Sequence, residues 1–196
     1  MPTELPSATT ARERAKVHRR HALLSAAARL FAERGYSGTS IDDLGAAAGV
    51  SGPALYKHFS GKQAMLAAIL LEASEGLYQG GQNVLAHSTG SSALRSLVTF
   101  HADFALDNAD VIRVQDRDLE QLPDHDRHTV RTLQRRYVEL WVDVLESLKP
   151  GLDRSVLRTR AHAVFGLLNS TPHTGHSLDR SKLRDELERM AIAALG

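Results

Sequence analysis

The sequence predicts an all-α protein in which a small N-terminal helix-turn-helix unit precedes a larger helical domain. Apolar residues recur at intervals of three and four along most of the 196 residues and almost nowhere alternate with a period of two. Glycines and serines with capping spacing divide the N-terminal third into short helices, whereas the later helices are long. We therefore expect two helical units of different size.

Composition narrows the classes of protein. The chain is 42% hydrophobic and 24% charged, as in soluble globular proteins, and it contains no cysteine, which excludes disulfides and thiolate metal sites. No apolar run approaches the roughly 20 residues that cross a bilayer, and the N-terminus lacks the apolar core of a signal peptide. We expect a cytoplasmic protein with no membrane contact.

Charge is divided unevenly along the chain. Residues 1–62 contain nine Lys or Arg against five Asp or Glu, a net charge of +4, and residues 63–196 contain fifteen against eighteen, a net charge of −3. A basic end suits a partner rich in phosphate, although a difference of this size also arises by chance.

Capping and helix-stopping residues mark the ends of the first helices. Leu23 to Phe31 share an apolar face, and Gly35 stops that helix. Ser40 and Asp43 have capping-box spacing at the start of a second helix. Ser51 can cap a third, with Pro53 in its first turn. Ser60 and Gln63 repeat the box spacing and open a longer helix.

The rest of the chain is also helical. Residues 80–92 predict a loop or a broken helix end, residues 94–105 a helix, and residues 110–117 a short helix. The strongest periodicity runs from Val130 to Leu148, and two more helices are expected over about residues 154–169 and 180–195.

The glycine turn at residues 49–51 joins two short helices in helix-turn-helix fashion, a geometry in which the second helix enters the major groove of DNA. With Leu55 and Phe59 facing inward, the residues that face outward as candidate DNA contacts are Gly52, Pro53, Ala54, Tyr56, Lys57 and His58.

The run AARLFAERGYSGTSIDDLGAAAGVSGPALYKHFSGKQAML resembles the DNA-binding domain of TetR-family regulators, and the match covers about residues 20–66. The resemblance rests on the LF…RGY…TS junction, the AAGVS turn and the LYxHF…K segment. It implies a nine-helix homodimer with a ligand pocket and with repression that ligand relieves. Carried over by position, the expected phosphate contacts are Thr39, Ser40, His58 and Lys62, the base-proximal contacts are Pro53 and Tyr56, and Ser51 joins the DNA-binding set. Asp42 and Gly52 depart from the long basic or amide side chains of some members, which weakens direct base readout.

Three segments follow from this organisation: a flexible basic arm over residues 1–19, a helix-turn-helix domain over 20–62, and a ligand-binding and dimerisation domain over 63–196. The arm and its boundary carry Arg19 and Arg20, which could reach the minor groove or the backbone of DNA. A solubilising tail is the alternative.

The larger domain offers a set of mostly aromatic residues that would line a small-molecule cavity if their helices converge: Tyr78, Phe100, His101, Phe104, Trp141, Phe165 and Asn169. Core packing explains each of them equally well, and a packed histidine explains His101.

The segments VIRVQDRDLEQLP, RTLQRRYVELW and VFGLLNSTP resemble TetR-family regulators of fatty-acid, sterol and acyl-CoA catabolism in actinobacteria. This implies an acyl-CoA or lipid-derived effector, with Arg113, Arg117, Arg135 and Arg136 available for its anionic group. Exposed ion pairs are the alternative use of these arginines.

The last two helices either complete the core or pair with a twin chain, and the resemblance favours the homodimer. A metal enzyme that uses His162, His173 and His176 is disfavoured, because the sequence contains no HExxH motif. A serine hydrolase is disfavoured because no serine lies in a GxSxG nucleophile elbow. We therefore expect no catalytic residue, cofactor or metal. A helical interaction module that no longer binds DNA is the remaining alternative.

Overall fold

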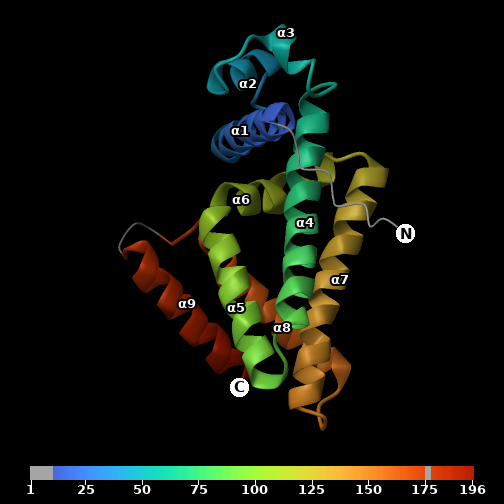
Figure 1. Cartoon of the computed structure of the whole chain (residues 1–196), viewed down its shortest axis with the longest axis vertical. Helices are drawn as coiled ribbons and strands as arrows, with labels where there is room; N and C mark the ends of the chain where they lie inside the picture. Colours follow the sequence, from blue (N-terminus) through green and yellow to red (C-terminus); the bar gives the residue numbers. More distant parts are fainter. Residues whose placement is uncertain (1–10, 175–177) are drawn as a thin grey trace, which may run out of the picture.

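The computed structural model describes residues 11–174 and 178–196, and over these ranges the chain forms nine α-helices and one 3-10 helix (Figure 1). A head contains α1 (Ala11–Arg34), α2 (Ile41–Ala47) and α3 (Gly52–Leu55). The body contains α4 (Lys62–Ala86), α5 (Gly90–Asp107), α6 (Ala109–Asp118), the 3-10 helix η1 (Leu119–Gln121), α7 (Asp124–Leu148), α8 (Arg154–Leu168) and α9 (Arg180–Leu195). The predicted all-α architecture with a three-helix N-terminal unit is confirmed.

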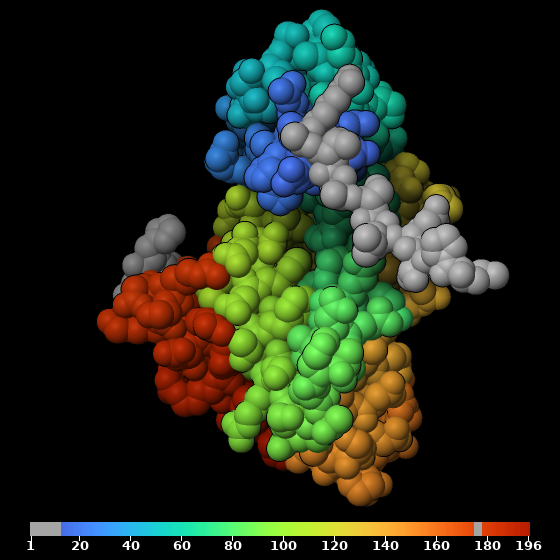
Figure 2. Space-filling model, viewed as in Figure 1, coloured from blue at the N-terminus to red at the C-terminus, as the bar shows by residue number. Residues whose placement is uncertain are grey.

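Helix α4 connects the two parts. It leaves the head and runs down the body beside α7, while α6 lies across the body beneath α1 (Figure 1). In the space-filling view the head forms one end of the molecule and α9 covers one side of α5 (Figure 2). The apolar core of the head includes Phe31 of α1, and also Leu66, Val114 and Val130 of the body. Head and body therefore share one apolar core where they meet.

The predicted flexible arm is wrong over part of its length. Residues 11–19 belong to α1, and the side chains of residues 13–19 are exposed. The segment ARERAKVHRR consists largely of strong helix formers and contains no Gly or Pro, so the helix extends beyond the head's core. Residues 1–10 of the expected arm lie outside the described residues.

The loop expected over residues 80–92 is also largely wrong, because α4 continues to Ala86. Gly80 lies against the ring of Phe100, where a Cβ would come within 2.1 Å of Cζ, and Gly81 lies against Tyr137. These glycines allow helices to approach closely, and they do not interrupt α4. The start of α4 also differs: Gly61 is its N-cap, and no side chain supplies the capping bond expected from Ser60.

Candidate nucleic-acid interface and internal cavities

The start of α2 is held by the predicted capping box. The Ser40 hydroxyl accepts a hydrogen bond from the Asp43 backbone N–H at 3.1 Å, and the Asp43 carboxylate accepts from the Ser40 backbone N–H at 2.9 Å. Hydrogen bonds from Ser40 lower the pKa of the Asp43 carboxyl. The cap fixes the direction of α2, and with it the turn into α3.

The turn between α2 and α3 depends on Gly49, whose φ of +67° lies in the left-handed region. Helix α3 begins beside Ser51, which is the N-cap by position but makes no side-chain capping bond, and Pro53 stands in its first turn as predicted. Helix α3 is one turn long and continues into a turn through which His58 and Phe59 still bond to the Leu55 carbonyl.

The outer side of α3 and its following turn is open. Tyr56 is 58% exposed, Pro53 and Lys57 are exposed, and Gly52, Ala54 and His58 are half-buried. The space beside Gly52 is limited, because a Cβ there would meet an Asp42 carboxylate oxygen at 2.7 Å. The predicted outward set is therefore accessible to a partner, most fully at Tyr56 and Lys57.

A basic hollow lies between α1 and the turn after α3. It is lined by Glu13, Lys16, Val17, Arg20, Lys57 and His58. The helical extension of α1 thus brings Lys16 and Arg20, far away in sequence, beside Lys57. Sequence reasoning assigned Lys16 to a flexible arm, and only its place on α1 joins it to this surface.

Three expected phosphate contacts are occupied within the head. Thr39 is 2% exposed and its hydroxyl donates to the Gly35 carbonyl at 2.8 Å. Lys62 Nζ donates to the carbonyls of Tyr36 at 2.8 Å and Thr39 at 2.9 Å. The Ser40 hydroxyl donates to Asp43, so its one hydrogen is already used. In this structure Thr39 and Lys62 fasten the α1–α2 loop and Ser40 caps α2, and their contact with phosphate stays a prediction.

Arg20 is also engaged, whereas Arg19 is exposed on α1. Arg20 bonds to Glu72 of α4, with 2.5 Å between Nη2 and Oε1, and its guanidinium lies 4.8 Å from the ring centre of Phe59. Both charged side chains are about two-fifths exposed, so this pair contributes little to stability. Its geometric effect is to place Arg20 at the edge of the basic hollow.

The body contains a core cavity of about 210 Å³, with walls from α4, α5, α6, α7 and α8. Its lining residues are Ser74, Leu77, His101, Gln115, Gln134, Tyr137, Val138, His162, Phe165 and Asn169. Of the predicted ligand-binding set, His101, Phe165 and Asn169 lie here. Sequence reasoning missed Gln134 and Tyr137, and the available signal was a glutamine on the apolar stripe of α7, three residues before Tyr137.

Aromatic rings form one wall of this core cavity. The His101 ring stacks on Phe165 at 4.8 Å and on Tyr137 at 5.6 Å between ring centres, and Trp141 meets Phe165 edge-on at 5.0 Å. His101 is 2% exposed, and burial lowers its pKa to about 4. Burial also raises the pKa of Tyr137. Both side chains are therefore uncharged at neutral pH.

The other predicted ligand-binding residues lie elsewhere. Trp141 is fully buried behind the aromatic wall, Phe100 packs on Gly80, and the Tyr78 hydroxyl accepts from Gln82 at 3.3 Å. Phe104 lines a separate junction cavity of about 260 Å³. The expected single aromatic pocket is therefore divided, because successive turns of α5 and α7 face different neighbours.

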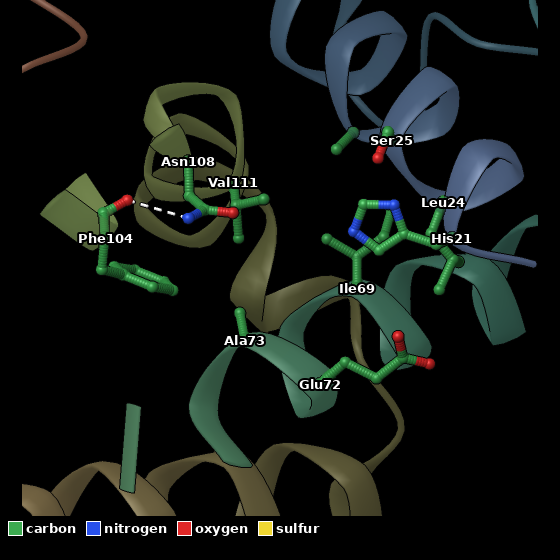
Figure 3. Close-up of a pocket in the computed structure, with 10 residues that line it drawn as sticks. His21, Leu24, Ser25, Ile69, Glu72, Ala73, Phe104, Asn108 and Val111 are labelled. Atoms are coloured by element: carbon green, nitrogen blue, oxygen red, sulfur yellow. Dashed lines mark hydrogen bonds between the residues drawn. The ribbon is translucent and has the colours of Figure 1, made fainter. Parts of the chain in front are cut away.

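Figure 3 shows this junction cavity between head and body. His21 and Ser25 of α1 face Ile69 and Glu72 of α4, and the Asn108 amide at the start of α6 donates to the Phe104 carbonyl at 2.8 Å. The cavity therefore has walls from both parts of the molecule.

The arginines expected to meet an anionic effector have varied surroundings. Arg113 donates to the Pro172 carbonyl at 2.7 Å, and Arg117 bonds to the carbonyls of α1 and to Asp118. Arg135 and Arg136 are exposed on α7. Arg117 is exposed as well, but it is already engaged by Asp118 and by the carbonyls of α1.

Within residues 11–174 and 178–196, no group of three or more His, Cys, Asp or Glu side chains is arranged to hold a metal ion. His176, one of the three histidines of the metal-enzyme alternative, lies outside these ranges. No helix in the described part of the chain has the length and apolar character to span a bilayer.

Comparison with known proteins agrees with this geometry. Residues 23–69 match the family described as bacterial regulatory proteins of the tetR family, and residues 87–173 match the tetracyclin repressor-like C-terminal domain. The chain is 34% identical over 143 residues to the HTH-type transcriptional repressor KstR2 of Rhodococcus jostii, covering 71% of this chain and 70% of the relative.

Solved structures show the same fold. The regulator PfmR of Thermus thermophilus superposes with a TM-score of 0.73 at 27% identity, over 96% of this chain and 97% of that one. AibR, solved with isovaleryl coenzyme A and operator DNA, gives a TM-score of 0.71 at 22% identity, over 88% of this chain and 97% of that one. The head with its open α3, the helical body and these similarities together show that the chain belongs to the TetR family of transcriptional regulators.

Proposed function

We propose that this protein is a homodimeric repressor that binds a palindromic operator through α3 and leaves it when an acyl-CoA or another lipid-derived effector enters the body. The observation that carries the proposal is the basic hollow, which places Lys16, Arg20, Lys57 and His58 beside the exposed Tyr56. Cations around the reading helix are what the phosphate backbone requires. Such a repressor would act in the bacterial cytoplasm.

The revised DNA-contact set follows from exposure. Tyr56 and Pro53 would approach base edges and sugars, and Lys57, Lys16 and Arg19 would meet phosphates. Gly52, Ala54 and Ser51 let the backbone come close, with His58 at the edge. Asp42 beside Gly52 offers a carboxylate where a base-reading amide would help, so phosphate contacts and DNA shape would carry much of the affinity.

The outer side of α8 and α9 supports the dimer. Val156 is 42% exposed and Met190 is 40% exposed, and the small residues Ala163, Gly166 and Ala194 are exposed near them along the two helices. Small side chains allow two helix pairs to approach closely, and a two-fold axis there produces the symmetric interface that a palindrome demands. The two copies of α3 would then lie about 34–36 Å apart, one turn of DNA.

The core cavity supports control by a small molecule, since buried cavities with a few polar groups are the usual ligand sites. Gln115 links this cavity to α6, the helix that packs beneath α1. An effector changes DNA binding only if it binds the two conformations unequally. Among similar proteins, AibR has been solved with isovaleryl coenzyme A, which supports an acyl-CoA as the class to test first.

Selection from a random duplex library with the purified chain tests DNA binding. We expect a palindromic site to be enriched, and Tyr56→Ala to weaken the enrichment while the mass in solution remains that of a dimer. No enrichment at low salt would favour an interaction module that lacks DNA binding.

Dimerisation and effector response have separate tests. Ala163→Arg should convert the dimer to a monomer, as measured by light scattering, because a cation would be buried in the interface. The matched change Ala86→Arg, exposed at the end of α4, should not.

A panel of acyl-CoA compounds should include a member that raises the melting temperature of the protein and lowers its affinity for the operator. A panel in which no compound does either would contradict the effector assignment.

A further inference from the structure

The walls of the core cavity contain no formally charged acidic or basic residue. Among the ten lining residues there is no Lys, Arg, Asp or Glu, and the polar ones are hydroxyl, amide and imidazole side chains. His101 is buried and uncharged at neutral pH, and the second imidazole of the lining, His162, is exposed to solvent. A ligand with a full charge would therefore lose its hydration here without gaining an opposite charge.

The hydrogen bonds of His101 determine which donor of Asn169 is left unused. A neutral imidazole has one donor and one acceptor nitrogen. His101 Nε2 lies 3.1 Å from the side-chain amide oxygen Oδ1 of Asn169 and so carries the hydrogen, which makes Nδ1 the acceptor for the Tyr137 hydroxyl at 3.2 Å. Because Oδ1 of Asn169 is used by His101, the Asn169 amide nitrogen Nδ2 is the remaining donor, and it has no acceptor among the described residues.

Gln134 supplies a second free donor. Its amide nitrogen is buried and has no acceptor among the residues that the structure describes, although the side chain lines the core cavity. Buried amide groups are normally satisfied, so a lone one beside a cavity indicates a missing partner with an acceptor oxygen.

The size of the cavity limits that partner. A volume of about 210 Å³ is smaller than most sites that enclose a whole drug-sized ligand, so only a compact group fits inside. The parallel rings of His101, Phe165 and Tyr137 provide a flat apolar wall against which such a group can lie.

We propose that the core cavity binds an uncharged, compact carbonyl group of the effector, a ketone, ester or lactone, whose oxygen accepts hydrogen bonds from Gln134 and Asn169. The inference rests on the proposed function, in that the cavity is taken as the effector site. Any charged part of the effector lies outside the cavity. Gln134 is the residue that selects an acceptor, and His101 positions Asn169 through Nε2.

Trp141 provides the readout. It is the chain's single tryptophan, it is fully buried, and it meets Phe165 of the cavity wall edge-on. Its fluorescence can be followed while the full-length protein is titrated at pH 7 with three probes that share one ring: cyclohexanone, cyclohexanecarboxylate and cyclohexylammonium. Free N-acetyltryptophanamide, titrated in parallel, corrects for quenching without binding.

We expect a saturable response to cyclohexanone and at least about tenfold weaker binding of both charged probes. Gln134→Leu keeps the side-chain size and removes the donor, so it should weaken cyclohexanone binding about two- to tenfold. Gln79→Leu, on the exposed side of α4, should have no effect.

Three outcomes would overturn the inference: equal or tighter binding of the carboxylate, no saturable response to cyclohexanone, or an unchanged affinity in Gln134→Leu. Operator binding by the unaltered protein, measured in the same preparation, tests the proposed function separately. A protein that binds its operator but prefers the carboxylate would refute this inference alone.

Discussion

Arg117, in the last turn of α6, donates a hydrogen bond from Nη2 to the carbonyl oxygen of Phe31, in the last turn of α1. Its Nη1 also donates to the Ala32 carbonyl at 3.3 Å, and buried Asp118 accepts from its Nε at 3.2 Å. A side chain of the body therefore sits at the carboxyl end of a head helix, where the helix dipole favours a cation. Since Gln115 on the same helix lines the core cavity, α6 touches both the cavity and the head.

Replacing this arginine should loosen the contact between head and body. Arg117→Gln should lower the free energy of unfolding by about 1–2 kcal/mol, because the carbonyls and Asp118 lose a charged donor. Urea denaturation followed by circular dichroism measures the change. The exposed Arg136 offers a matched control, whose change to Gln should shift stability by less than about 0.5 kcal/mol. Equal effects of the two variants would contradict the role given to Arg117.

Salt dependence distinguishes a phosphate contact from a base contact. Lys57→Ala should weaken operator binding and reduce the slope of log affinity against log salt by about 1 for each head that binds, because one counterion fewer is released. Fluorescence anisotropy over a salt series measures both quantities. Lys149→Ala, at the far end of α7, should change neither, and a Lys57 variant with the wild-type slope would remove that lysine from the phosphate contacts.

The head was predictable from sequence because its caps and turn depend on residues close together in the chain. Spacing alone predicted the cap of α2 from Ser40 and Asp43, the turn from Gly49 and the start of α3 from Pro53. The roles of Thr39 and Lys62 were not predictable in this way. Lys62 bonds to carbonyls 23 and 26 residues earlier in the chain, a distance over which spacing carries no information.

The cavities show the same limit. Aromatic residues on α5 and α7 indicated a pocket in the body, but which of them faces it depends on helix rotation and on neighbouring helices. Phe104 lines the junction cavity and His101 the core cavity, although they are only one turn apart on α5. The sequence predicts a helix break at Gly80, because the close contact of Gly80 with Phe100 depends on the packing of α5 on α4 and leaves no local signal.

That contact gives a test of helix packing. Gly80→Ala should destabilise the fold by about 1–2 kcal/mol, because crowding of the Phe100 ring outweighs the gain in helix propensity. Thermal denaturation of the single variant and of Gly80→Ala with Phe100→Leu measures the crowding, and the second change should restore part of the loss. Gly76→Ala in the same helix is the control: a Cβ there meets nothing within 4 Å, so stability should rise by up to about 1 kcal/mol. A stabilised Gly80→Ala would show that the Phe100 ring moves aside freely.

The buried imidazole predicts a dependence of stability on pH. His101 has a pKa of about 4 in the folded protein against 6.5 as the ordinary value, with burial as the main cause. Between these values the unfolded chain binds a proton that the folded chain does not, so stability falls as pH falls through this window and is fully present above about pH 6.5. From about pH 6.5 to 5 this one group should remove about 2 kcal/mol from the free energy of unfolding.

His101→Gln isolates that contribution, because an amide can still bond to Tyr137 and Asn169 but does not titrate. Urea denaturation at about pH 7.5, 6.5 and 5 should show a smaller loss of stability in the variant than in the wild type, whatever their difference at neutral pH. Asp43, Asp153 and Asp179, whose pKa values are lowered by hydrogen bonds, lose their contribution only below about pH 4, outside this window. Parallel pH profiles in the two proteins would mean that His101 already takes up a proton in the folded state near neutral pH, and the uncharged character of the core cavity would then fail with it.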